Sequence, residues 1–137
     1  MSAIKDYYTI KLHDTDAAGI LFFANQLRIV HDVYERFLAT IGFPFVEMFE
    51  KKEFFIPIVH AETDYTQMLT DGDTVEIELV VSEIGKTSFT LEYRLTNLDG
   101  IVVGTAKTVH VTIDPVKKQK MDIPEKLRTG LENYLGK

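Results

Sequence analysis

The sequence predicts an α+β protein in which one long helix lies along an antiparallel sheet. Three observations support this prediction: only one segment has a long helical apolar period, five segments have strand-like patterns, and short glycine-bearing connections separate the later strands. Short connections of this kind join antiparallel strands. With 137 residues, of which 45% are hydrophobic, the chain is expected to form a single domain over residues 1–137.

The first half of the chain contains one strand and the long helix. Residues 7–13 alternate between apolar and polar side chains, which predicts a half-buried strand. A helix is predicted over residues 24–41, because apolar side chains recur every three or four positions, and Gly42 followed by Pro44 ends it. A short helical turn is expected at residues 46–50. The apolar stripe of the long helix comprises Leu27, Val30, His31, Tyr34, Phe37, Leu38 and Ile41.

The second half of the chain is rich in strands. Four strands are predicted, at residues 54–66, 74–83, 87–96 and 101–113. Residues 124–135 form an amphipathic terminal helix that opens on Pro124. Because only one long helix is available to cover the sheet, we expect the second layer to come from this terminal helix or from a partner chain.

Composition excludes several classes of function. The net charge of −6 argues against a nucleic-acid partner, since phosphate attraction requires a basic surface. No apolar run approaches the roughly 20 residues that span a bilayer, and the first residues do not read as a signal peptide, so no membrane partner is expected. The absence of cysteine excludes disulfides and thiol nucleophiles and favours the reducing cytoplasm.

The segment at residues 13–25, HDTDAAGILFFAN, is the best indication of function. It places Asp16 in a turn between a strand and the start of the long helix, close to backbone N–H groups that have no intrahelical acceptor. A carboxylate beside such donors can attack a carbonyl or activate water, while the donors stabilise an oxyanion. On the residue alone, the commoner structural alternative is a solvated loop carboxylate.

Metal binding by the same segment is not expected. The spacing of Asp14, Asp16 and Gly19 is superficially that of a calcium loop, but Ala18 supplies no side-chain oxygen and Asn25 stands where a bidentate glutamate is needed. The four histidines lack the close helical pairing of a zinc site. We therefore expect no metal and no cofactor.

Three separated motifs carry a resemblance to a known family. They are Asp14–Gly19 with Phe22–Asn25, then Pro57–His60, and then Gly85–Phe89. On these motifs the chain resembles the hotdog-fold acyl-CoA thioesterases of the 4-hydroxybenzoyl-CoA thioesterase type, over nearly its whole length. The histidines at 31 and 60 and the segment at 108–111 are most similar to the 1,4-dihydroxy-2-naphthoyl-CoA hydrolases of quinone biosynthesis.

The resemblance implies a hotdog fold, with a five-stranded antiparallel sheet wrapped around the long helix. It also implies homodimers that join two sheets edge to edge, often a homotetramer, and an active site at the dimer interface. The expected activity is hydrolysis of an acyl-CoA thioester, with aromatic acyl groups favoured over long fatty chains. Ala17 departs from the proline of many members, and the position of His31 can be acidic in the family.

The resemblance assigns the chemistry to the Asp16 turn. Asp16 is expected to act as nucleophile or as general base, and the backbone N–H of Phe23 is expected to polarise the thioester carbonyl. Gly19 is expected to permit the tight backbone path beside the substrate. The structural alternative for the Phe23 side chain is ordinary core packing.

Two further groups of residues are expected to bind substrate. His31, with His60, is expected to meet a ring hydroxyl or carbonyl of the acyl group, although each could instead be a packed structural histidine. Lys86, Thr87 and Ser88 are expected to hold the nucleotide end of coenzyme A, although a turn lysine is commonly just solvated.

Other functions fit the same residues. The nearest enzymatic alternative is a thioesterase for short or medium aliphatic acyl-CoA, or for acyl groups on acyl carrier protein. An alternative of another class is a non-catalytic acyl-CoA-binding module, because fold alone does not establish activity. Loss of Asp16 separates the classes, since a binding module would tolerate that loss.

Overall fold

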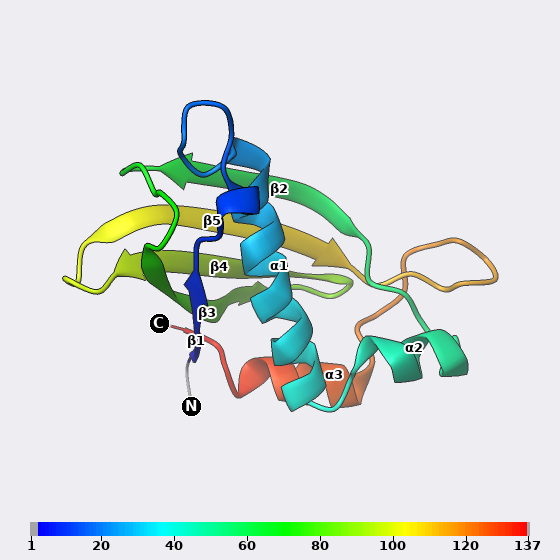
Figure 1. Cartoon of the computed structure of the whole chain (residues 1–137). Coiled ribbons are helices and arrows are strands. Elements are labelled where there is room, and N and C mark those ends of the chain that lie inside the picture. Colours follow the sequence, from blue (N-terminus) through cyan, green and yellow to red (C-terminus); the bar gives the residue numbers. More distant parts are fainter. Residues whose placement is uncertain (1–2, 137) are drawn as a thin grey trace.

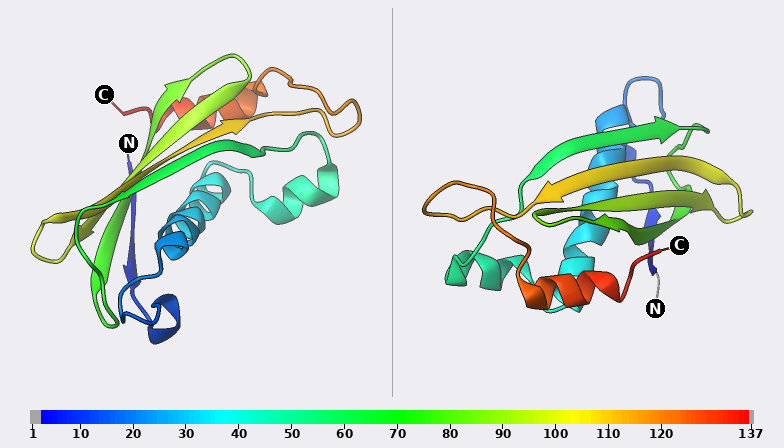
Figure 2. Two further views of the ribbon diagram at one scale, coloured as in Figure 1. Left: turned by 90° about the horizontal axis from the view of Figure 1, so that it is seen from above. Right: turned by 180° about the vertical axis from the view of Figure 1, so that it is seen from behind.

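The structure consists of a curved antiparallel sheet with a long helix lying across its concave face (Figure 1). This computed structural model describes residues 3–136. The strand order in the five-stranded sheet is β1-β3-β4-β5-β2. The strands are β1 (Ile4–Thr9), β2 (Ile58–Tyr65), β3 (Thr74–Ile84), β4 (Ser88–Asn97) and β5 (Val102–Val111). The predicted α+β hotdog arrangement is therefore confirmed, and Figure 2 shows the sheet curving around the helix from two further sides.

The helices agree closely with the predicted ranges. They are α1 (Phe23–Thr40), α2 (Phe45–Lys51) and α3 (Glu125–Glu132). The first strand, however, does not extend to His13 as predicted. It ends at Thr9, and Leu12–Asp14 form the 3-10 helix η1. The Asp14 carboxylate accepts the N–H of Lys11 at 2.8 Å, which closes this turn and removes the segment from the sheet.

The position of β2 also differs from the prediction. The short glycine-bearing connection at residues 71–73 predicts a hairpin between the strands on either side of it, but β2 pairs with β5, and β1 pairs with β3. Because β3 lies between β1 and β4, it cannot pair with β2, and residues 66–73 cross from the end of β2 to the start of β3. The Leu21 N–H donates to the Leu69 carbonyl at 2.7 Å, so this crossing segment is anchored to the loop before α1.

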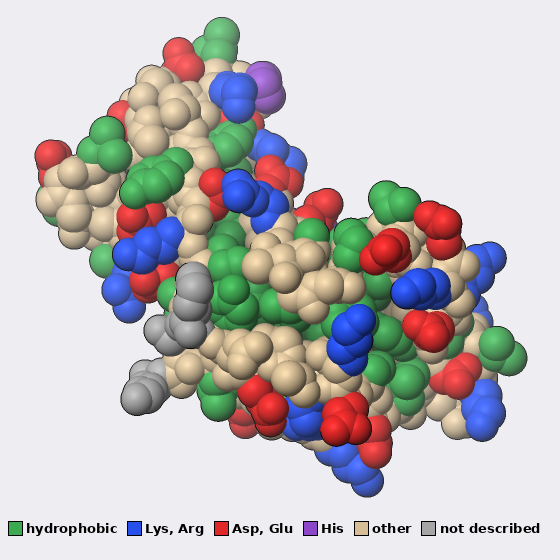
Figure 3. All heavy atoms as spheres, turned by 90° about the horizontal axis from the view of Figure 1, so that it is seen from below, with side chains coloured by type: hydrophobic (Ala, Val, Ile, Leu, Met, Phe, Trp, Pro, Cys, Tyr) green, Lys and Arg blue, Asp and Glu red, His purple; other side chains and the backbone are tan. Residues whose placement is uncertain are grey.

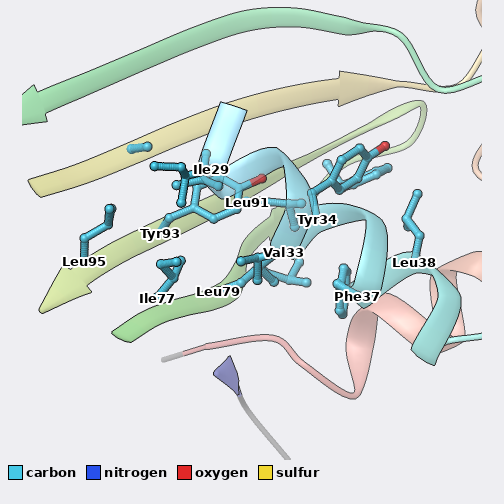
Figure 4. Close-up of a cluster of buried hydrophobic side chains, with 14 of the residues drawn as sticks. Ile29, Val33, Tyr34, Phe37, Leu38, Ile77, Leu79, Leu91, Tyr93 and Leu95 are labelled. Carbon is cyan, nitrogen blue, oxygen red and sulfur yellow. The ribbon is translucent and has the colours of Figure 1, made fainter. Parts of the chain in front are cut away.

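The core lies between α1 and the concave face of the sheet (Figure 4). Its largest fully buried side chains include Tyr34 and Phe37 from α1 and Leu79 and Leu91 from β3 and β4. Burial of one such side chain contributes about 1.5–3 kcal/mol. The buried face of α1 is rotated slightly from the predicted stripe. It comprises Gln26, Ile29, Val30, Val33, Tyr34, Phe37 and Leu38.

Helix α3 also covers part of the core, and the terminal helix was one of the two expected sources of a second layer, together with a partner chain. Leu127 and Leu131 are fully buried, and the Tyr134 ring packs edge-on against Phe37 with centroids 5.2 Å apart. On the side of the molecule where α3 lies, hydrophobic side chains show between charged ones (Figure 3). Within residues 3–136, no helix combines the length and apolarity needed to cross a membrane.

Candidate active site

Asp16 lies in a tight turn between η1 and α1. Its N–H donates to the Ile20 carbonyl at 2.9 Å, and its carbonyl accepts the N–H of Gly19 at 2.9 Å. Gly19 has φ +81°, a conformation that favours glycine, so the turn requires this residue. The Asp16 carboxylate is exposed and accepts one hydrogen bond, from the Ala18 N–H at 2.9 Å. Most of its hydrogen-bonding capacity is therefore free for a reactant.

The neighbouring carboxylate, Asp14, is fully buried and has a different environment. It accepts hydrogen bonds from the Tyr8 hydroxyl at 2.6 Å and the Lys11 N–H at 2.8 Å, and it pairs with the Arg28 guanidinium. Burial by itself would raise the pKa of the Asp14 carboxyl, but these hydrogen bonds and the Arg28 charge together hold that pKa below its usual range. Asp14 is thus an ionised structural anchor for the loop.

The anchor also positions the start of α1. The Asp14 carbonyl accepts the Phe22 N–H and the Asn25 side-chain amide, each at 2.9 Å. Helix α1 then begins at Phe23, whose N–H, as the first of the helix, has no intrahelical acceptor. Within residues 3–136 no other acceptor binds this N–H. The helix start therefore presents a free donor whose position is set by Asp14.

A cavity of about 320 Å³ brings Asp16 and Phe23 together. The segment that follows β2 forms its other wall, and much of its lining is apolar. The cavity is lined by Asp16, Ile20, Leu21, Phe23, Gln26, Tyr65, Thr66, Gln67, Met68 and Leu69. Gln26 and residues 65–68 were not among the predicted site residues. Gln26 could have been found as a polar side chain on the buried face of an amphipathic helix.

The two predicted histidines do not meet within one chain. His31 is half-exposed on α1, with Nδ1 3.0 Å from the Glu35 carboxylate. In β2, Thr63 faces α1, because its hydroxyl accepts a hydrogen bond from Gln26. Side chains alternate along a strand, so His60 points to the opposite face of the sheet, where it lies 2.8 Å from Glu62.

A third histidine, His110, is fully buried in the core. Its ring stacks on Phe89 with centroids 4.8 Å apart, and its Nε2 lies 2.7 Å from the Thr108 hydroxyl. Burial, with a smaller contribution from the charge of His31, lowers the pKa of His110 to about 3. The imidazole is therefore neutral at physiological pH and acts as a core side chain.

The predicted coenzyme A residues lie in the hairpin between β3 and β4. The hairpin is closed by the Gly85 N–H donating to the Ser88 carbonyl at 2.7 Å, and Arg128 donates to the Gly85 carbonyl at 2.6 Å. Lys86 is exposed, and Thr87 and Ser88 are half-buried. The Asp16 loop bridges to the segment that leads into β3, at Ile20 and Thr70, whereas this hairpin follows the last residue of β3, and 11 strand residues span about 36 Å. One chain therefore keeps the two groups apart.

A larger cavity of about 460 Å³ lies at the other end of α1. Its walls come from the segments around Phe43 and Phe54 and from the approach to α3, and no predicted site residue lines it. In the part of the chain that the structure describes, no three histidine, aspartate or glutamate side chains are grouped as metal ligands would be. The Asp16 cavity is therefore the candidate active site.

Comparison with known families identifies the class of protein. Residues 10–131 match the thioesterase-like superfamily, and the chain belongs to this family. It is similar to a 1,4-dihydroxy-2-naphthoyl-CoA hydrolase from Synechococcus elongatus, with 37% identity over 124 residues that cover 90% of each chain. These findings confirm the predicted family and thioester hydrolase activity.

Solved structures share the fold. A 1,4-dihydroxy-2-naphthoyl-CoA thioesterase from Synechocystis superposes with a TM-score of 0.90 at 23% identity, covering 96% of this chain and 97% of that one. A gentisyl-coenzyme A thioesterase superposes with a TM-score of 0.84 at 28% identity, covering 93% of this chain and 99% of that one. Both neighbours carry the same sheet wrapped around a helix.

Proposed function

We propose that this protein hydrolyses the thioester of an aromatic acyl-CoA, with 1,4-dihydroxy-2-naphthoyl-CoA as its substrate. One observation supports this proposal above the others: Asp16, with its exposed carboxylate, and Phe23, whose N–H has no acceptor among residues 3–136, line one cavity with largely apolar walls. The similar hydrolase from Synechococcus elongatus acts on a dihydroxynaphthoyl thioester, and the gentisyl-coenzyme A thioesterase acts on another dihydroxylated aromatic acyl group.

The proposed mechanism divides the work between two groups. The Phe23 N–H donates to the thioester oxygen, where negative charge grows as the carbonyl becomes tetrahedral. The positive end of the α1 dipole adds to this stabilisation. Asp16 either attacks the carbonyl and forms an anhydride that water then hydrolyses, or removes a proton from the attacking water. Either route releases coenzyme A as the thiol and the acyl group as the carboxylic acid.

The test is thiol release from a panel of aromatic and aliphatic acyl-CoA thioesters. The proposal expects fast release from the aromatic members and a loss of about 10³-fold or more in turnover for Asp16→Asn. Asp99→Asn, in an exposed loop, is the matched control and should retain full turnover. Preference for aliphatic or carrier-protein thioesters would keep the mechanism and overturn the substrate, whereas full turnover by Asp16→Asn would overturn the mechanism.

His31 is proposed as the contact for a ring hydroxyl or carbonyl of the acyl group. Its half-exposed imidazole and its Glu35 partner allow it to donate a hydrogen bond at the protein surface. His60 is proposed to contribute separately, from the other face of the sheet. The preference is the ratio of kcat/KM for hydroxylated over unsubstituted aromatic acyl groups, and His31→Ala should lower this ratio by about 10-fold. His60→Ala tests the second residue in the same assay.

A homodimer is proposed to complete the site. In the sheet formed by residues 3–136, one side of β2 is unpaired, and exposed apolar side chains such as Val59 lie on this strand. Antiparallel pairing of two β2 strands would bring the Asp16 end of one sheet toward the Lys86 end of the other. The coenzyme A nucleotide would then lie against Lys86, Thr87 and Ser88 of the second copy, and two dimers would form a tetramer.

Charge reversal tests this part of the proposal. Lys86→Glu should raise KM by about 10-fold and leave kcat nearly unchanged, since the residue would bind the nucleotide and not the reacting carbonyl. An unchanged KM would remove Lys86 from the site. Light scattering of the purified protein gives the oligomeric state, and a monomer that hydrolyses the substrate would overturn the shared site.

The cellular setting follows from the substrate. Hydrolysis of 1,4-dihydroxy-2-naphthoyl-CoA supplies the free naphthoic acid for quinone biosynthesis, which we propose as the role of the protein. A chain without cysteine suits the reducing cytoplasm, the proposed location. We further propose that residues 1–137 act as one thioesterase domain, because α1, α3 and the sheet share one core.

A further inference from the structure

We infer that Tyr65 is a positioning residue for catalysis, which holds and polarises the first peptide of α1 through its hydroxyl. The inference rests on the proposed function, in which the start of α1 supplies the donor for the thioester carbonyl. It adds a residue from β2 to a site otherwise built from the Asp16 turn and the helix.

The contact that carries the inference joins the end of β2 to the first residue of α1. The Tyr65 hydroxyl donates to the Phe23 carbonyl at 2.6 Å. A tyrosine hydroxyl is protonated at neutral pH and can donate, and partial burial raises the pKa of Tyr65 further. Both residues line the cavity that contains Asp16. A tyrosine hydroxyl therefore contacts the backbone of the residue that presents the free N–H.

Besides the hydrogen bond from Tyr65, a second set of hydrogen bonds ties the first turn of α1 to the sheet. The buried Gln26 amide donates to the Thr63 hydroxyl at 2.7 Å and to the Asp64 carbonyl at 2.9 Å. A Cβ on Gly104, in the adjacent strand β5, would lie 2.7 Å from the Gln26 amide nitrogen, so only glycine leaves room for it. The first turn of α1 is thus tied to the sheet through two side chains, Gln26 and Tyr65.

The hydrogen bonds of Gln26 and of Tyr65 differ in their effect on the helix backbone. Gln26 bonds through its side chain and leaves the helix peptides unchanged. Tyr65 instead bonds the carbonyl of the peptide that joins Phe23 to Ala24, and a hydrogen bond at a carbonyl strengthens the N–H of the same peptide as a donor. The Ala24 N–H is, like that of Phe23, one of the helix-start donors without an intrahelical acceptor.

Packing alone does not account for the tyrosine. Its side chain is 46% exposed, at the mouth of the cavity, and it belongs neither to the buried core nor to the partly buried shell around it. A phenylalanine would keep the ring in place and lose only the hydroxyl. This makes the hydroxyl separable from the fold in an experiment.

The experiment compares Tyr65→Phe with Tyr7→Phe. Tyr7 is the matched control, because its exposed hydroxyl also makes one hydrogen bond, 2.9 Å to Glu76, but on the outer strand β1. With 1,4-dihydroxy-2-naphthoyl-CoA, Tyr65→Phe should lower kcat about 10-fold, the effect of one ordinary hydrogen bond on a rate constant, and change KM less than about twofold. Tyr7→Phe should match the wild type in both constants.

A spectroscopic measurement provides a second readout that does not depend on turnover. In nitrogen-15 correlation spectra of the free protein, Tyr65→Phe should move the Ala24 amide resonance upfield, because its peptide loses a hydrogen bond at the carbonyl. An unmoved Ala24 resonance, or a kcat equal to that of Tyr7→Phe, would overturn the inference while Asp16-dependent hydrolysis still supports the proposed function. A wild type that hydrolyses none of the acyl-CoA panel would overturn the proposed function and this inference together.

Discussion

Asp14 and Asp16 are two positions apart in the sequence and have opposite surroundings. Asp14 is fully buried and bound by Tyr8, Lys11 and Arg28, which together satisfy its charge. Asp16 is exposed and accepts a single backbone hydrogen bond. The first carboxylate is fully used in holding the loop and the start of α1, whereas the second is available to a substrate.

Under the proposed mechanism, this loop separates a structural role, at Asp14, from a chemical role, at Asp16. A reacting carboxylate needs unused lone pairs, but a loop that carries one needs a rigid support. The chain places the support two residues earlier, with a carboxylate whose pKa is held below its usual range and which therefore stays charged. We expect substitutions at the two positions to affect different measurements.

The largest effect on stability is expected for Asp14→Asn. Removing the charge leaves the Arg28 guanidinium without its buried partner, and breaking such a pair costs about 3 kcal/mol, the lower part of the usual range, because Arg28 itself is partly exposed. Urea unfolding of the purified variant measures this loss. A change below about 1 kcal/mol in the free energy of unfolding would show that Asp14 does not anchor the loop and the start of α1.

A second test contrasts Asp14 with His110, since the former is buried charged and the latter buried neutral. The pKa of His110 falls from 6.5 unfolded to about 3 folded, so its contribution to stability is complete above pH 6.5 and is lost as pH falls. At pH 4.5, two pH units below 6.5, the loss amounts to about 3 kcal/mol.

Replacement of the histidine isolates this effect. Urea unfolding of His110→Gln between pH 7 and pH 4.5 should lack the loss found in the wild type, although its stability at pH 7 is lower. The pKa of Asp14 is held below its ordinary value of 3.8, so the stability it contributes is present above pH 3.8 and is lost only as the pH falls below that value; Asp14 should therefore not change the curve between pH 7 and pH 4.5. Parallel pH curves for the wild type and His110→Gln would contradict the assignment of His110 as a buried neutral group.

Gly104→Ala tests the support that β5 gives to the same end of α1. The added Cβ would lie 2.7 Å from the Gln26 amide nitrogen and 3.0 Å from the Asp64 carbonyl, and overpacking of this kind costs about 2 kcal/mol. The double variant Gly104→Ala with Gln26→Ala removes the clash with Gln26, which is the shorter contact, so the two losses should not add in full. Additive losses in urea unfolding would mean that the glycine has no connection with Gln26.

The smallest effect on stability is expected for Asp16→Asn. An exposed side chain with one hydrogen bond contributes little, so the free energy of unfolding should change by less than about 0.5 kcal/mol while turnover falls steeply. Measurement of both quantities on one preparation completes the comparison with Asp14. A large loss of stability in Asp16→Asn would contradict the proposal that Asp14 has the structural role and Asp16 the catalytic one, because unfolding could then explain the loss of turnover.

Much of the fold was predictable because its signals are local. The period of α1, the stop at Gly42 and Pro44, and the turns before β4 and β5 each depend on a few neighbouring residues. The end of β1 was predicted too late, because the burial of Asp14 depends on Tyr8 and Arg28, which lie on separate elements. The pairing of β2 with β5 was not predicted, because the partner of a strand depends on which sheet edge the other strands leave unpaired.

The site divides in the same way. The spacing of Asp16 and Phe23 could be recognised from a contiguous motif, and the structure places both on one cavity. The roles predicted for His31, His60 and Lys86 stay predictions, since one chain leaves these side chains apart. Tyr65 gave no signal in the sequence, because a tyrosine near the end of a strand is ordinary until its hydroxyl is seen on the helix.

Residues close together in the chain were enough to predict the long helix, most of the strands and the turn that carries Asp16, and three separated motifs were enough to predict the family by resemblance. Which carboxylate is buried, which face of the sheet His60 occupies and how β2 supports the start of α1 became clear only in the folded chain. These outcomes depend on contacts between residues such as Tyr65 and Phe23, 42 positions apart. Local patterns do not encode such contacts, because they arise when distant elements pack together.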